Sequence, residues 1–183
     1  MSPADSALVV RTRRAFPRPA GTVWPLLCNS KMDGSHRLLF RLGVPQPLEC
    51  RLPDGEGVGH ERECVSDQGV VHQRILTWAP ETKLSFRMES NDLRWSRLVD
   101  GIEDTFDLQT TPTGVRVTRT TRVQVRPTAS LFQRLGLRLG LKQVHRYVFR
   151  NWARLARLSD PNGRPTAMRS RGLSAATGSA KTR

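Results

Sequence analysis

The chain has 183 residues and a formal net charge of +14, with 37% hydrophobic and 25% charged residues. This composition is typical of a globular protein rather than a disordered one, and the length allows one domain with a sizeable core. No apolar run approaches the roughly 20 residues of a membrane-spanning helix, and residues 1–7 lack the pattern of a signal peptide. Cys28, Cys50 and Cys64 form no CxxC motif, so we expect small buried thiols in a cytoplasmic protein.

The positive charge is concentrated in the second half of the chain. Residues 1–107 contain 14 Lys or Arg and 15 Asp or Glu, whereas residues 108–159 contain 11 Lys or Arg and no acidic residue. This asymmetry favours either an anionic partner or a solvated basic face. Because neither a nucleic-acid motif nor interleaved aromatic residues accompany the cations, we expect only weak contact with polyanions or a membrane surface.

The first predicted element is a β-strand, Leu8–Phe16, which Pro17 and Pro19 end. Proline is tolerated in the first turn of a helix, so a short helix is predicted over Pro19–Asn29. A second short helical piece is predicted over Gly34–Leu42.

Six further strands are predicted between turn signals that recur every 10–15 residues, as in an antiparallel meander. They are Pro47–Leu52, His60–Ser66, Val70–Trp78, Lys83–Ser90, Gly101–Gln109 and Val115–Arg126.

The last predicted element is a long amphipathic helix over Ala129–Leu158. Its apolar residues recur at intervals of three and four: Leu137, Leu141, Val144, Val148, Trp152 and Leu155. After Asp160 the chain is rich in Ser, Ala, Thr, Gly, Lys and Arg, so residues 159–183 are predicted to be a disordered basic tail.

An antiparallel sheet followed by a single helix can bury its apolar face by curling around that helix. The sequence therefore predicts an α+β domain over residues 8–158: a curved seven-stranded antiparallel sheet around the C-terminal helix, with two short helices after the first strand. A sheet curled in this way usually encloses a cavity, which makes ligand binding the first functional hypothesis.

Several short motifs occur in the order found in one superfamily. They are Phe16-Pro17-Arg18-Pro19 with Val23-Trp24, Gly57-Val58-Gly59-His60-Glu61-Arg62, Gln73-Arg74-Ile75 with Trp78-Ala79-Pro80 and Leu84-Ser85-Phe86, and Gly114-Val115-Arg116-Val117 before the last helix. From Leu8 to Leu158 the chain resembles the START-like (SRPBCC) superfamily, which includes polyketide cyclase/dehydrase, lipid-transport and Bet v 1-like proteins. The resemblance implies a helix-grip fold with a cavity between the sheet and the last helix, and no single activity.

Asp104 and Arg119 are predicted to form an inward-facing pair. Asp104 alternates with the apolar residues of its strand, and Arg119 does so in the next strand. If the hairpin closes through residues 109–114, so that Leu108 faces Val115, the two charges lie directly opposite each other. Such a pair could be structural, or could orient a ligand at the cavity wall.

The predicted cavity is lined by Phe16, Phe106, Val117, Leu141, Val144 and Val148. If Phe16 faces inward, as the resemblance implies, Arg14 does so too; it could bind an anionic ligand group, pair with an acid or reach solvent. His72 is a third candidate, with Asp104 and Arg119, for acid–base chemistry, although alternation leaves its face ambiguous. No metal-ligand spacing occurs, and no metal or cofactor is expected.

The leading hypothesis is a carrier or sensor for a small, largely apolar ligand such as a lipid, polyketide or isoprenoid-like molecule. One alternative is a cofactor-free cyclase or dehydratase that uses acid–base residues of the cavity. Another is an interaction protein whose basic helix docks on a ribosome or an anionic membrane.

Overall fold

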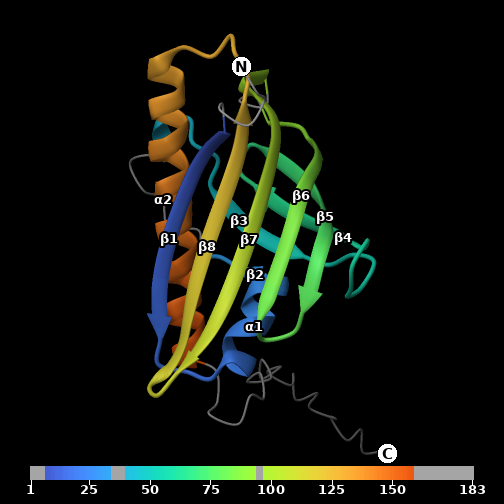
Figure 1. Cartoon of the computed structure of the whole chain (residues 1–183), viewed down its shortest axis with the longest axis vertical. Helices are drawn as coiled ribbons and strands as arrows, with labels where there is room; N and C mark the ends of the chain where they lie inside the picture. The colour runs from blue at the N-terminus through green and yellow to red at the C-terminus, as the bar shows by residue number, and fades with distance from the viewer. Residues whose placement is uncertain (1–6, 34–39, 94–96, 159–183) are drawn as a thin grey trace, which may run out of the picture.

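The computed structural model describes residues 7–33, 40–93 and 97–158. A curled antiparallel sheet of eight strands wraps around one long C-terminal helix (Figure 1). The elements in chain order are β1 (Ala7–Phe16), α1 (Ala20–Cys28), β2 (Ser30–Lys31), the 3-10 helix η2 (Phe40–Leu42), β3 (Pro47–Arg51), β4 (Glu61–Ser66), β5 (Gly69–Ala79), β6 (Lys83–Asn91), β7 (Val99–Thr111), β8 (Gly114–Val125) and α2 (Leu131–Leu158).

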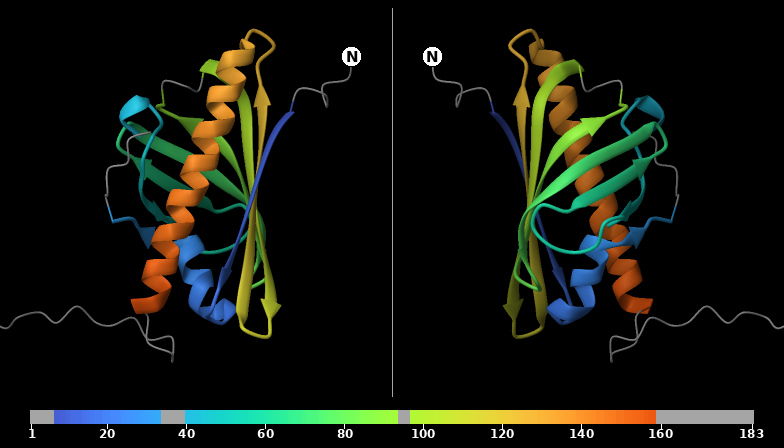
Figure 2. Two further views of the ribbon diagram at one scale, coloured as in Figure 1. Left: turned by 90° about the vertical axis from the view of Figure 1, so that its left-hand side faces the viewer. Right: turned by 90° about the vertical axis from the view of Figure 1, so that its right-hand side faces the viewer.

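The strand order across the sheet is β1-β8-β7-β6-β5-β4-β3-β2. The first strand therefore pairs with the last one, while every other neighbour is a sequential partner. The side views show the sheet curving around α2, with α1 beside the C-terminal part of that helix (Figure 2). The α+β class and the curled sheet were predicted from the sequence.

The predicted count of seven strands is one too low. The additional strand, β2, consists of Ser30 and Lys31 only, which pair with Cys50 and Glu49 at the edge of the sheet. Two residues are too few to show an alternating pattern. Of the predicted helical piece Gly34–Leu42, residues 34–39 lie outside the described residues, and the remainder is the single turn η2.

The predicted register of the β7–β8 hairpin is wrong by two residues. The hairpin closes tightly at Thr111 and Gly114, so Leu108 faces Val117 rather than Val115. Gly114 has a φ of 141°, and a Cβ atom there would collide with the backbone of Phe16 and Arg18. Only glycine fits this turn. Because side chains alternate with a period of two, the shift leaves the same residues facing inward.

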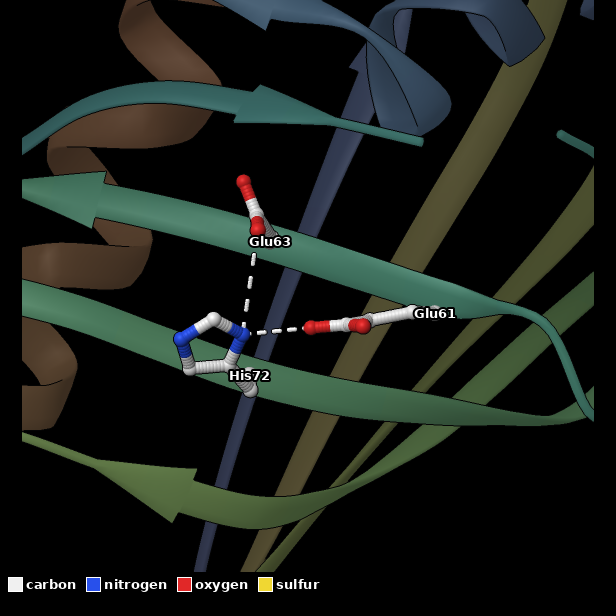
Figure 3. A group of neighbouring side chains, drawn as sticks. All are labelled: Glu61, Glu63 and His72. Carbon is white, nitrogen blue, oxygen red and sulfur yellow. Dashed lines mark hydrogen bonds and ion pairs between the residues drawn. The ribbon is translucent and has the colours of Figure 1, made fainter. Parts of the chain in front are cut away.

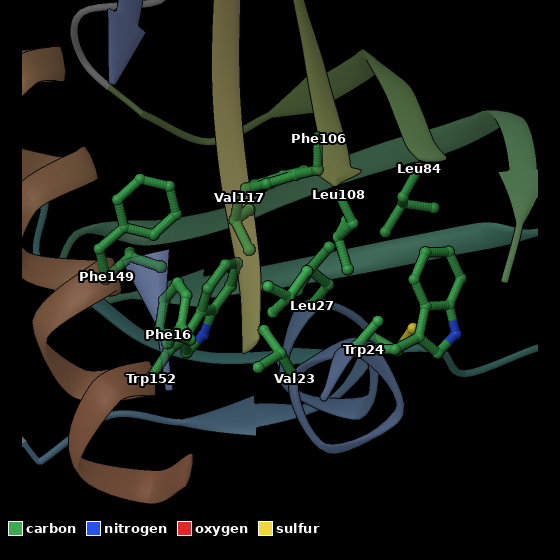
Figure 4. Packing of buried hydrophobic residues seen from close by; sticks show 14 of the residues in the cluster. Phe16, Val23, Trp24, Leu27, Leu84, Phe106, Leu108, Val117, Phe149 and Trp152 are labelled. Carbon is green, nitrogen blue, oxygen red and sulfur yellow. The ribbon is translucent and has the colours of Figure 1, made fainter. Parts of the chain in front are cut away.

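The core consists of two clusters. The larger one joins α1, the sheet and the second half of α2, where Phe16, Phe106, Phe149 and Trp152 pack together with Leu27 (Figure 4). The smaller cluster, at the other end of the sheet, is built on Val99, Ile102, Val123, Val125 and Ala129. All buried residues of α2 lie at or after His145, and residues 131–144 contribute none.

Candidate ligand-binding cavity

A cavity of about 400 Å³ lies between the sheet and the first half of α2. Its wall is mostly apolar and includes Phe86, Met88, Ile102, Phe106, Leu137 and Leu141. Gly43, Gln133 and Gly136, which are exposed, also line it, so the cavity reaches the protein surface. Most of the α2 residues that line it belong to the first half of the helix, which contributes no buried residue, and Val148 and Trp152 close it on the side of the larger core cluster.

Four of the six apolar residues predicted to line the cavity do so: Phe106, Leu141, Val144 and Val148. Phe16 and Val117 do not line the cavity; both are buried among other side chains of the larger core cluster. The ring of Phe16 packs edge-on against Phe149, with a centroid distance of 6.1 Å. The bulky second half of α2 fills that end of the sheet and confines the cavity to the other end.

Asp104 and Arg119 form an ion pair at the cavity wall. Arg119 donates from Nε to Oδ1 of Asp104 (3.1 Å) and from Nη2 to Oδ2 (2.8 Å), and the side chains of Arg119 and Asp104 are 12% and 5% exposed. In the observed register Asp104 faces Thr121 and Arg119 faces Phe106, so the pair is diagonal rather than directly opposed. The Arg side chain is long enough to reach the diagonal neighbour.

A hydrogen-bonded chain extends from this pair to α2. The Thr121 hydroxyl donates to Asp104 Oδ1 and lies 2.7 Å from Nε2 of His145, whose Nδ1 lies 3.1 Å from the hydroxyl of Thr12. Burial, reinforced by the charge of Arg119, lowers the pKa of His145 to about 3. The imidazole is therefore neutral at pH 7. Because the Thr121 hydroxyl uses its hydrogen to donate to Asp104, it can only accept from His145. Nε2 of His145 therefore carries the imidazole proton and donates to Thr121.

The carboxyl group of Asp104 is ionised. Burial alone would raise its pKa, but the charge and hydrogen bonds of Arg119, with a further hydrogen bond from Thr121, lower the pKa overall. The carboxylate thus already accepts three hydrogen bonds within the protein. It is poorly suited to take a proton from a substrate near neutral pH.

Arg62 is a residue of the cavity wall that sequence reasoning did not single out. It lies on β4 and is fully buried, with its guanidinium 4.3 Å from the centroid of the Phe86 ring. Nη1 donates to Gln73 and to the sulfur of Cys64, and Nη2 donates to the carbonyl of Leu27 (3.1 Å). Its Nε has no hydrogen-bond partner among the described residues. Burial, and then the nearby Arg119, lower the pKa of Arg62 to about 10, so the group stays charged at pH 7.

Arg14 lies outside the cavity. It faces inward, as predicted, but at the other end of the sheet, with its guanidinium 5.9 Å from the centroid of the Phe16 ring. Burial, and then Arg150 and Arg157 near the end of α2, lower its pKa. It therefore belongs to a cluster of cations beside the C-terminal end of the helix, a position that the helix dipole favours.

His72 also lies outside the cavity. Its neighbours Val71 and Gln73 line the cavity, so alternation directs His72 to the opposite face, where it meets Glu61 and Glu63 (Figure 3). The hydrogen bond to Glu61 raises the pKa of His72. His72 is therefore not a candidate for acid–base chemistry in the cavity.

The three side chains Glu61, Glu63 and His72 offer ligand atoms within 4.8 Å of one another, a grouping that spacing alone did not predict. However, His72 is hydrogen-bonded to Glu61, and Glu63 forms an ion pair with Arg51 at 2.5 Å. A metal ion would have to break both the hydrogen bond between His72 and Glu61 and the ion pair between Arg51 and Glu63. We interpret the cluster as a cross-strand ion-pair network on the outer face of the sheet.

The expectation of three isolated thiols is wrong for two of the cysteines. Cys50 and Cys64 are directly opposed on β3 and β4, with Cα atoms 4.3 Å apart, and they form a disulfide at the cavity wall. Cys28 is a free, buried thiol, and burial raises its pKa to about 12. It agrees with the interpretation as a small hydrophobic residue.

The curled sheet and its long C-terminal helix define the fold class: the chain has the Bet v 1-like helix-grip fold. A solved structure of a Mesorhizobium loti protein matches 84% of this chain and 99% of its own, with a TM-score of 0.60 and 20% identity. Ara h 8.0201, a Bet v 1 homologue, matches 82% of this chain and 97% of its own (TM-score 0.61, 12% identity). A Thermus thermophilus protein matches 81% and 97%, respectively (TM-score 0.59, 15% identity).

These similarities establish the fold and leave the activity open. No protein-family model matches the sequence, and no curated protein does so either. None of the described helices is both long and apolar enough to cross a membrane.

Proposed function

We propose that the protein binds a small, largely apolar ligand in the cavity between its sheet and α2, as a carrier or sensor. The observation that carries this proposal is a cavity of about 400 Å³ with a mostly apolar wall that reaches the surface. Protein interiors are normally close-packed, whereas ligand pockets have volumes of roughly 300–1,000 Å³ and apolar walls. A cyclase or dehydratase has less support, because Asp104 is fully engaged and His72 faces away from the cavity.

The test compares ligand uptake by the wild-type protein with that by a variant whose cavity is filled. Val144 lines the cavity, so Val144→Trp is expected to abolish the fluorescence enhancement of the neutral probe N-phenyl-1-naphthylamine. Val58 is exposed in the β3–β4 loop, and Val58→Trp is the matched control that should bind like the wild type. Native mass spectrometry of the purified protein would identify a copurifying ligand. A wild-type protein without probe uptake, or equal uptake by Val144→Trp, would contradict the proposal.

We further propose that the first half of α2 makes weak contact with anionic membranes. Leu131, Phe132, Leu135 and Leu139 are exposed there, and Phe132 is 85% exposed. Arg134 and Arg138 lie among them, and residues 108–158 include no acid that would oppose an anionic surface. An amphipathic helix with exposed apolar residues and flanking cations is suited to a membrane interface.

Co-sedimentation with vesicles tests this second proposal. Binding to phosphatidylcholine vesicles that contain phosphatidylserine should exceed binding to pure phosphatidylcholine vesicles and should decrease with salt. Phe132→Ser with Leu135→Ser should abolish it, whereas Val58→Ser, at an exposed apolar residue elsewhere, should not. Equal sedimentation of the double variant would contradict the proposal, as would salt-sensitive binding to ribosomes but not to vesicles.

A further inference from the structure

We infer that the ligand is an amphiphilic acid: its carboxylate is bound by Arg62 at the sheet wall, and its apolar body fills the rest of the cavity. This inference rests on the proposed ligand-binding function and adds the chemical class of the ligand.

The charges of the cavity wall do not balance. Among the described residues that line the cavity, three are ionised at pH 7: Arg62, Asp104 and Arg119. His145, which is joined to Asp104 through Thr121, is neutral. The wall therefore carries a net charge of +1 on side chains that are themselves largely buried. Buried charges are normally paired with an opposite charge, because an unpaired one is costly to remove from water.

The unbalanced charge belongs to Arg62. The single carboxylate, Asp104, accepts hydrogen bonds from Nε and Nη2 of Arg119 and from the hydroxyl of Thr121. All of the hydrogen-bond partners of Arg62 are neutral, and its aromatic partner Phe86 is a cavity residue as well. Its Nε–H is buried and makes no hydrogen bond to any described residue. A carboxylate would supply the missing acceptor and the missing negative charge together.

The remainder of the wall determines what accompanies the carboxylate. Toward the surface the lining changes to Val44, Leu137, Leu141 and Val144, with no ionised side chain among the described residues there. An amphiphile would thus lie with its acid at the strands and its apolar end near the first half of α2. A neutral hydrocarbon would leave Arg62 without a counter-charge, and a polyanion would have too few cations to contact.

The experiment is a calorimetric comparison of decanoate with decanamide, which has the same chain and a planar but uncharged head. The wild-type protein should bind decanoate more tightly by roughly ten- to 150-fold, the range expected for a hydrogen bond to a charged group. Arg62→Met should remove this preference and leave the affinity for decanamide within a few-fold. The matched control Arg116→Gln replaces an exposed arginine of β8 and should retain the full preference.

A structural role of Arg62 makes a different prediction. If Arg62 served only to hold β4, Arg62→Met would unfold the protein or weaken the binding of both probes equally. Arg62→Lys keeps the charge. It should restore the preference for decanoate if that charge recognises the carboxylate, and should not restore it if Arg62 is only structural. Equal binding of both probes by the wild-type protein would overturn the inference and leave the proposed function standing. Binding of neither probe would overturn both.

Discussion

Removing Asp104 should destabilise the protein more than removing its partner Arg119. Asp104→Leu leaves Arg62 and Arg119 as two buried cations with no acid beside them. Arg119→Met leaves one cation, Arg62, and one carboxylate, Asp104. These two remaining charges attract each other. Breaking a buried ion pair costs about 3–5 kcal/mol. We expect Asp104→Leu near the upper end of that range and Arg119→Met at or below the lower end.

The double variant, Asp104→Leu with Arg119→Met, has the same net charge in the cavity wall as the wild-type protein. Replacing both members of a buried pair with apolar side chains of similar volume is often close to neutral, so we expect a loss of less than about 2 kcal/mol. Urea unfolding, followed by circular dichroism at constant m-value, measures all three free energies of unfolding. Asp107→Leu is the control: it breaks the exposed ion pair to Lys83 on the neighbouring strand and should cost about 1 kcal/mol or less. Additive losses, or a larger loss for Arg119→Met than for Asp104→Leu, would refute the reasoning.

Three further predictions concern pH, helix stability and the disulfide. The folded pKa of His145, about 3, lies below the unfolded value of 6.5, so its contribution is complete above pH 6.5 and is lost as the pH falls toward 3. At pH 5 the wild-type protein should have lost about 2 kcal/mol relative to His145→Gln, and parallel pH profiles of stability would contradict this. Gly136→Ala should raise the free energy of unfolding by about 0.5–1 kcal/mol, because a Cβ there meets open space within a helix; a decrease in urea unfolding would contradict this. Reduction of the Cys50–Cys64 disulfide, which closes a loop of sequence separation 14, should lower stability by about 3 kcal/mol, and an unchanged midpoint in reductant would show that the bond is absent.

Alternation was sufficient to assign the faces of the last two strands. Asp104 and Arg119 face inward because both alternate with apolar residues, and the two-residue error in register did not alter this. The error arose at the turn, where the close approach of Gly114 to the backbone of Phe16 forces a tighter closure than sequence spacing suggests. That approach depends on where β1 lies, which local sequence does not specify.

The alternation of polar and apolar residues could not assign the inward face of strands whose two faces both carry polar residues. In β4 and β5, polar and charged residues occupy both faces, so Arg62 and His72 could not be distinguished as inward and outward. The disulfide could not be predicted either, because it depends on the pairing of Cys50 with Cys64 across two strands. A buried arginine is identified by its three-dimensional surroundings, such as Phe86 and Gln73, rather than by a pattern in its own strand.

The pairing of β1 with β8 has a consequence for synthesis. Residues that pair along this ladder lie about a hundred positions apart in the sequence, from Ala7 with Gln124 to Phe16 with Val115. At about 5–20 residues per second, the N-terminal strand must wait roughly 5–20 s on the ribosome before its partner is made. The helix α2, which completes the larger core cluster, follows later still. Until then Val10 and Phe16 have no core to enter, and the nascent chain depends on its many charged residues, or on a chaperone, to avoid association with other chains.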